Sequence, residues 1–119
     1  MISKKLIIAA AISTLAVFAF AQARSEYLAG LSGTGKGKAK YKSAPEAAEL
    51  QVEGERLSSN ATYIVSVPNA MWTVTTNGFG SFRLAQRFGA NRPAIVAGTP
   101  ITVSTPAGAT VQSGVFAAK

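Results

Sequence analysis

The sequence predicts an all-β fold: a small antiparallel β-sandwich of immunoglobulin-like size with seven or eight short strands, or alternatively a small β-barrel. Three observations support this prediction. From residue 36 onward, apolar side chains recur with a period of two, as they do along half-buried strands. Turn residues interrupt this pattern at short intervals. The chain has 119 residues and no cysteine, so we expect one small domain that folds without disulfides.

Residues 1–23 have the pattern of a secretory signal peptide, which we expect to be helical. Lys4 and Lys5 make the start positive, an uncharged apolar stretch follows, and Ala21 and Ala23 form the small-x-small pattern that signal peptidase recognises. As a helix, the apolar stretch would extend about 24 Å, short of the ~30 Å hydrocarbon core of a membrane. We therefore expect cleavage after Ala23 and a secreted or periplasmic protein.

Residues 24–35 are rich in glycine and small side chains, and we expect a flexible lead-in. Residues 30–37 differ by one position from the P-loop of nucleotide-binding proteins, since Gly37 stands where the hydroxyl that holds Mg²⁺ is needed. A P-loop also requires a strand before it and a helix after it, and the sequence predicts neither. No nucleotide is expected here.

Residues 36–42 and 49–55 are expected to form the first β-hairpin of a single domain, 36–119. Lysines occupy every even position of the first segment, and glutamates dominate the odd positions of the second. In one antiparallel register, Tyr41 and Leu50 meet on the opposite, apolar face, and a shift of one residue would mix the two faces. The same register pairs Lys36 with Glu55, Lys38 with Glu53, Lys40 with Gln51 and Lys42 with Glu49. The sequence thus predicts a hairpin with an ion-paired outer face.

Two further hairpins are expected in the middle of the chain, from strands at 61–67, 72–76 and 81–85. Pro68 begins the turn of the first, and Asn77 begins a turn with two glycines in the second. The expected pairs are Val67 with Trp72 and Val65 with Val74 in the first hairpin, and Val74 with Phe82 and Trp72 with Leu84 in the second.

The last third of the chain has a looser pattern. Residues 86–93 predict a loop or an edge segment, because Pro93 cannot donate to a central ladder. Residues 94–97 predict a short strand. Residues 101–104 and 110–116 predict a last hairpin.

The inventory of side chains argues against catalysis. The chain has no histidine, cysteine or aspartate, and its only acids are five glutamates. Histidine is the usual general base near neutral pH, and histidine and cysteine are the usual ligands of transition metals. We therefore expect a protein that is not an enzyme and that uses no cofactor.

Arg83, Arg87 and Arg92 are the candidate contacts for an anion or a partner. The segment 57–119 contains no acidic residue, and guanidinium groups bind oxyanions through two parallel hydrogen bonds. The alternative is that these arginines only keep an edge strand soluble. Phe79 lies between two glycines at a predicted turn, where it either folds back onto the domain or offers an exposed contact to a partner.

These features predict an exported, non-enzymatic module with a structural or protein-interaction role at the cell envelope or outside the cell. The alternative is a binder of an anionic polymer (polysaccharide, lipid headgroups or nucleic acid) through the three arginines. Self-assembly through edge strands is a further expectation, because the chain is low in charge and ends in an apolar segment around Val115 and Phe116.

Overall fold

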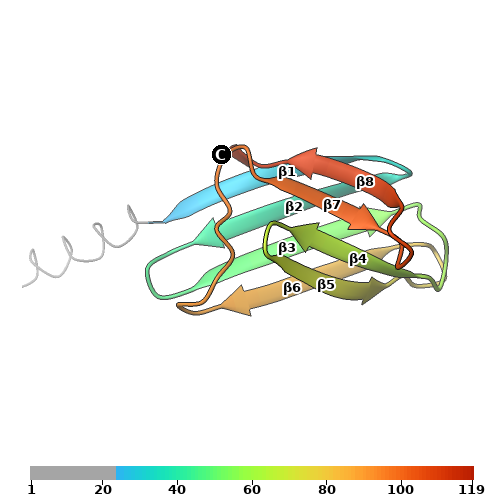
Figure 1. The fold of residues 1–119 in the computed structure, drawn as a ribbon, viewed down its shortest axis with the longest axis horizontal. Helices are drawn as coiled ribbons and strands as arrows, with labels where there is room; N and C mark the ends of the chain where they lie inside the picture. The colour runs from blue at the N-terminus through green and yellow to red at the C-terminus, as the bar shows by residue number, and fades with distance from the viewer. Residues whose placement is uncertain (1–23) are drawn as a thin grey trace, which may run out of the picture.

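The computed structural model describes residues 24–119. These residues form nine strands and no helix (Figure 1). The strands are β1 (Ser25–Gly33), β2 (Lys36–Ser43), β3 (Ala48–Glu55), β4 (Thr62–Val67), β5 (Ala70–Thr75), β6 (Phe82–Phe88), β7 (Pro100–Ser104), β8 (Thr110–Val115) and β9 (Ala117–Ala118). The predicted signal peptide, with Ala21 and Ala23, lies outside the described residues. Within 24–119, no helix has the length and apolar character needed to cross a membrane.

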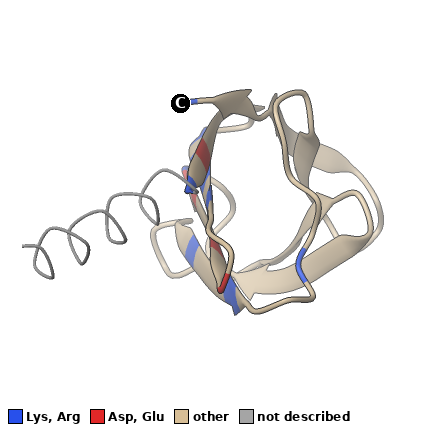
Figure 2. Ribbon diagram, turned by 90° about the vertical axis from the view of Figure 1, so that its left-hand side faces the viewer, with Lys and Arg blue, Asp and Glu red and all other residues tan. Residues whose placement is uncertain are grey.

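Eight strands follow one continuous antiparallel path in the order β5-β4-β7-β8-β1-β2-β3-β6, and β9 pairs with β1. The path curls (Figure 2) until its two ends, β5 and β6, approach each other (Figure 1). No ladder joins these two strands within the described part of the chain. Side chains meet there instead, with the rings of Trp72 and Phe88 6.0 Å apart between centroids. The all-β prediction is confirmed, as a nearly closed barrel that fits both the sandwich and the barrel alternative.

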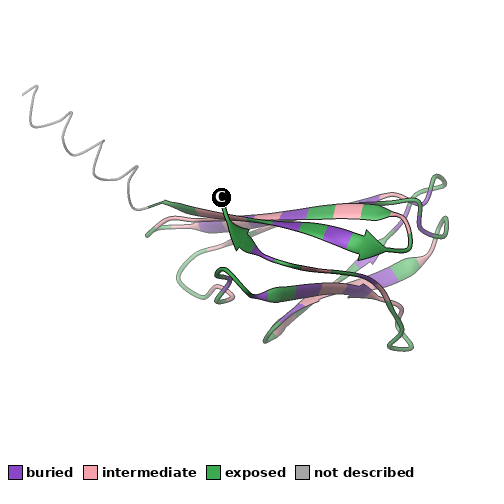
Figure 3. Cartoon of the chain, turned by 90° about the horizontal axis from the view of Figure 1, so that it is seen from above, coloured by how far each residue is buried: buried purple, intermediate pink, exposed green. Residues whose placement is uncertain are grey.

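Buried residues alternate with more exposed ones along the strands of this path (Figure 3), and the buried hydrophobic side chains form one cluster. Strand β3 shows the alternation most regularly, since every second residue from Ala48 to Gly54 is buried. The completely buried side chains come from opposite sides of the sheet: Leu50, Val52, Val65, Ile101 and Val103. One core therefore serves the whole fold, as expected for a domain of this length.

The predicted register of the β2–β3 hairpin is confirmed over its full length. Lys36 lies opposite Glu55 at one end and Lys42 opposite Glu49 at the other, with Tyr41 opposite Leu50 on the buried face. Both faces of this hairpin carry a regular pattern. Each face therefore independently specifies the same register.

The predicted register of the β4–β5 hairpin is wrong by two residues. Val65 pairs with Trp72 and Val67 with Ala70, which leaves a two-residue turn. Pro suits the first position of such a turn, and Asn69 takes the second with a φ of 67°. A shift of two residues keeps every side chain on its face, so the apolar pattern could not distinguish the two registers.

The expected hairpin between β5 and β6 is also wrong. Strand β6 pairs with β3 instead, with Leu84 opposite Val52 and Arg83 opposite Glu53. Residues 76–81 carry the chain from one end of the sheet path to the other. The alternation of apolar and polar side chains along β6 is compatible with pairing to either β5 or β3. The curling of the whole sheet selects β3.

The expected flexible lead-in is wrong as well, because most of residues 24–35 form strand β1. This strand lies inside the sheet path and buries Ala29 and Leu31. Gly35 has a φ of 72°, and a side chain there would collide with the backbone carbonyl of Glu55. The glycines thus form a tight turn between β1 and β2, and the segment similar to a P-loop is a β-hairpin. The domain accordingly begins at β1 and not at residue 36.

One expectation for the last third of the chain is confirmed and another is wrong. Residues 86–93 are the predicted edge segment and loop, because β6 ends the sheet path and continues to Phe88, where a loop begins. Residues 94–97 form no strand, although Ile95 is buried in the core. The predicted last hairpin is confirmed as β7 and β8.

Candidate interaction surface

Charge divides the curled sheet into two halves (Figure 2). Strands β4, β5, β7 and β8 contain no lysine, arginine, aspartate or glutamate, and we call them the uncharged half. Strands β1, β2, β3 and β6 lie next to one another along the path and carry most of the charges of the domain; we call them the charged half. This segregation makes the solvent side of the charged half the candidate interaction surface.

The outward side chains of the charged half form a surface that we call the charged face. Cross-strand pairing arranges them in columns, with lysines along β2, glutamates along β3 and arginines along β6. The ten charged members are Glu26, Lys36, Lys38, Lys40, Lys42, Glu49, Glu53, Glu55, Arg83 and Arg87. Six are basic and four are acidic, so the face combines both signs and has only a small positive excess.

The ion pairs on this face differ from the predicted ones. Arg83 Nη2 lies 3.0 Å from Glu53 Oε2, and Lys119 Nζ lies 3.4 Å from Glu26 Oε1. These are the two ion pairs among residues 24–119, so the expected lysine–glutamate pairs between β2 and β3 are not formed. The register brings lysine and glutamate backbones together, but Glu53 also has Arg83 on its other side. Side chains this exposed gain little from pairing, so their lysine amines stay in solvent.

The three candidate arginines do not form one site. Arg83 and Arg87 are both exposed on the charged face, on the same side of β6. Arg92 instead holds two loops together, and its guanidinium donates to Ser43 Oγ at 3.0 Å. It also donates to three backbone carbonyls: Gly89 at 2.8 Å, Ala44 at 2.6 Å and Pro45 at 3.3 Å. Because these acceptors occupy its donors, Arg92 has a structural role, and the candidate anion contacts reduce to Arg83 and Arg87.

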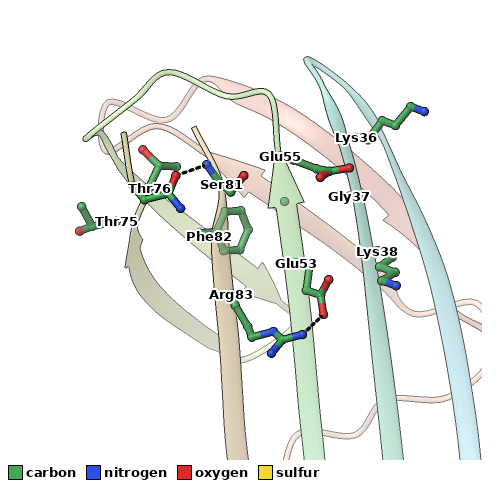
Figure 4. Close-up of a pocket in the computed structure, with 12 residues that line it drawn as sticks. Lys36, Gly37, Lys38, Glu53, Glu55, Thr75, Thr76, Ser81, Phe82 and Arg83 are labelled. Carbon is green, nitrogen blue, oxygen red and sulfur yellow. Dashed lines mark hydrogen bonds and ion pairs between the residues drawn. The ribbon is translucent and has the colours of Figure 1, made fainter. Parts of the chain in front are cut away.

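A groove of about 730 Å³ lies at one end of the charged face (Figure 4). Phe82 is among its lining residues, and the Phe82 ring packs on Gly54, where a side chain would collide with it. The charged side chains along the groove are Lys36, Lys38, Glu53, Glu55 and Arg83. Sequence reasoning assigned the two lysines to ion pairing and so missed them as site residues.

Phe79 extends from a loop beside this groove, and 89% of it is exposed. The loop is ordered by Asn77, whose Oδ1 accepts hydrogen bonds from the backbone N–H groups of Phe79 at 2.9 Å and Ser81 at 3.0 Å. Asn77 and Ser81 also line the groove. Of the two alternatives for Phe79, the structure therefore shows the exposed one: an aromatic ring held in solvent at the edge of the charged face.

Tyr41 is a buried residue of the charged half, and its pKa is perturbed. Burial raises the pKa of its phenol above the ordinary value of 10.0, and Ser43 and Arg92 lower it by smaller amounts. Its hydroxyl donates to the carbonyl of Pro93 at 3.1 Å. Tyr41 therefore holds the 89–93 loop against the sheet. In the described range, no group of three potential ligands among glutamate side chains is placed to hold a metal ion.

No known protein family matches the chain, and no curated protein sequence matches it.

Proposed function

We propose that this protein is an exported, non-enzymatic β-domain that binds a protein partner through the charged face. The observation that carries the proposal is the segregation of charge onto one half of the sheet, where ordered columns of opposite sign face solvent. If the charges served solubility alone, we would expect them on all the strands, whereas the four neighbouring strands of the uncharged half have none. Electrostatic complementarity across such a face selects a partner and its orientation.

The alternation of sign favours a protein over an anionic polymer. The glutamates of β3 lie between the lysines of β2 and the arginines of β6, so a polyanion that crosses the face meets repulsion in its centre. A protein surface, in contrast, can present acidic side chains to the lysines and arginines and basic side chains to the glutamates. Phe79 adds an exposed aromatic side chain of the kind that anchors protein interfaces.

An anionic polymer remains the second candidate, through Arg83 and Arg87. A hollow of about 440 Å³ beside Arg87 supports it, since Arg24 and Lys42 also line that hollow. Glu46 and Glu49 line the same hollow and oppose a polyanion there. Retention on a heparin column that weakens steeply with salt would favour this candidate over the first.

The experiment uses immobilised residues 24–119, which contain every strand of the fold, and a cell-envelope extract of the source organism. We expect a retained protein that is lost with Lys38→Glu, because this change reverses one charge in the lysine column. The matched control is Thr62→Glu with Thr73→Glu on the exposed side of the uncharged half, which changes the net charge by the same amount. Equal retention by both variants would show that the charged face does not select the partner.

A further inference from the structure

We propose that the partner of the charged face is a second copy of this chain. The two copies meet face to face around a two-fold axis that runs parallel to the strands, between β2 and β3. This inference rests on the proposed function, because it uses the same face and names its partner. It follows from the order of charges across the four strands of the charged half.

A two-fold axis in this position places β2 of one copy over β3 of the other. Residues that are cross-strand partners within one chain then face each other between chains, at the same height along the strands. Lys42 of one copy therefore lies over Glu49 of the other, and the symmetry repeats this contact in reverse. The same exchange applies to Lys36 with Glu55 and to Lys38 with Glu53. Each of these three lysine–glutamate rows is thus complementary to itself, although Glu53 already pairs with Arg83 in its own chain.

The outer strands of the charged half add an attractive contact in one row, whereas in the row of Lys38 and Glu53 they place Arg83 over Gly30. Strands β1 and β6 are equally far from the axis, so β6 of one copy lies over β1 of the other. Arg87 then faces Glu26, because both belong to the row that contains Lys42 and Glu49. This row reads negative, positive, negative, positive across the sheet, and the rotation inverts every sign in it.

The middle row is apolar at its two outer positions, and its inner positions hold one lysine and one glutamine. Leu28, which is 40% exposed, faces Ala85 of the other copy, while Lys40 faces Gln51. This arrangement would cover an exposed leucine without opposing two like charges. The apolar contacts thus lie on the two outer strands, the centre of the face is polar, and the ion pairs lie toward both ends of the strands.

The area of the face predicts a weak complex. The eight residues of β3 span about 26 Å and four strands span about 19 Å, so two flat faces of this size would bury on the order of 1,000 Å² together, and the curled sheet buries less. This value is at the lower end for specific interfaces. Sheets that pack face to face are also rotated by about 30°, so the residues nearest the centre of the face keep the best alignment. We expect association in about the micromolar to millimolar range that weakens as salt rises.

Two opposite charge reversals test the symmetry. Lys42→Glu places glutamate over Glu49 twice in a homodimer, and Glu49→Lys places lysine over Lys42 twice. Each variant alone should weaken self-association by about tenfold or more, because both symmetric contacts become repulsive. An equimolar mixture of the two should recover association, since both contacts in the heterodimer are then attractive. A single chain that carries both substitutions should also recover it.

Sedimentation velocity over a range of concentrations and salt measures all of these species, and far-UV circular dichroism checks that each variant is folded. The control, Thr62→Glu with Thr73→Glu, should associate like the native chain. A native chain that stays monomeric at low salt overturns the self-association. So does a mixture that is no stronger than its separate components. Neither result bears on whether the charged face retains a protein from the envelope extract. The proposal that this face binds a protein partner is therefore overturned only by the retention experiment.

Discussion

The two halves of the curled sheet have similar apolar side chains on their buried side and different side chains on their solvent side. In the charged half, Tyr41 and Leu50 form a buried pair beneath ordered columns of charge. In the uncharged half, Val65 and Val103 pair in the same way beneath threonine, serine and isolated apolar side chains. The shared interior provides the stability of the domain. The difference between the exteriors indicates where selective contacts with other molecules are made.

The exteriors also differ in how strongly they specify strand register. In the β2–β3 hairpin, the outward charges and the inward apolar residues independently favour the same pairing. In the β4–β5 hairpin, the outward side chains Thr73 and Ser66 carry no charge that would distinguish one pairing from another two residues away. There the turn at Pro68 and Asn69 selects the register. Where the outward side chains are uncharged, the geometry of the turn determines the strand register.

The largest expected effect tests whether the two halves share one core. Leu50→Ala in the charged half and Ile101→Ala in the uncharged half each remove a completely buried side chain. Each should lower the free energy of unfolding by about 2–5 kcal/mol. Urea unfolding, followed by circular dichroism and by Trp72 fluorescence, should show one coincident transition in both variants. Separate transitions for the two signals would mean that the halves unfold independently.

The next largest effect concerns the side chain that links the halves. Gln112 of β8 is buried, and its Nε2 donates to the carbonyls of Thr34 at 2.9 Å and Lys36 at 3.0 Å in the β1–β2 hairpin. Gln112→Leu leaves both carbonyls unsatisfied and should cost about 1–3 kcal/mol. The loss should be near the lower end, because Gln112 Oε1 itself has no partner among residues 24–119. The exposed neighbour Ser113→Ala is the control, and an equal loss in both would refute this linking role.

Arg92 in the loop after β6 and Arg83 on the charged face should differ in how much they contribute to stability. Arg92→Ala removes a set of hydrogen bonds that joins two loops and should cost about 1–3 kcal/mol. Arg83→Ala removes an exposed ion pair and should cost less than about 1 kcal/mol. Thermal unfolding of both variants measures the difference. A larger loss for Arg83 would contradict the structural role assigned to Arg92.

The smallest effect is a loss of stability at alkaline pH that comes from the charged half. Burial raises the pKa of Tyr41, so the folded state holds the phenolic proton more tightly than the unfolded state. This contribution is fully present below the ordinary pKa of 10.0 and is lost as pH rises through the higher folded value. Denaturant unfolding between neutral pH and pH about 11 should show this fall. Tyr41→Phe should reduce it, and an unchanged alkaline profile in that variant would assign the effect to another group.

The candidate site was only partly predictable. Phe79 and the pair Arg83 and Arg87 were identifiable, because an aromatic residue between glycines and neighbouring arginines in a segment without acidic residues are local signals. The distinct role of Arg92 was not, since its acceptors lie in a loop nearly 50 positions earlier in the chain. The lysines along the groove were assigned to ion pairs because register alone places glutamates opposite them. Only side-chain geometry shows that Glu53 turns to Arg83 instead.

The sequence by itself determined the all-β class, the hairpin of β2 and β3 and the last hairpin of β7 and β8, because period-two patterns and nearby turns are local properties. The tertiary structure alone decided that Ser25–Gly33 forms a strand inside the sheet path and that β6 pairs with β3. A glycine-rich segment, or one in which apolar and polar residues alternate, can pair with several different strands equally well. The choice among those neighbours depends on how the sheet curls to bury one core, which is a property of the whole chain.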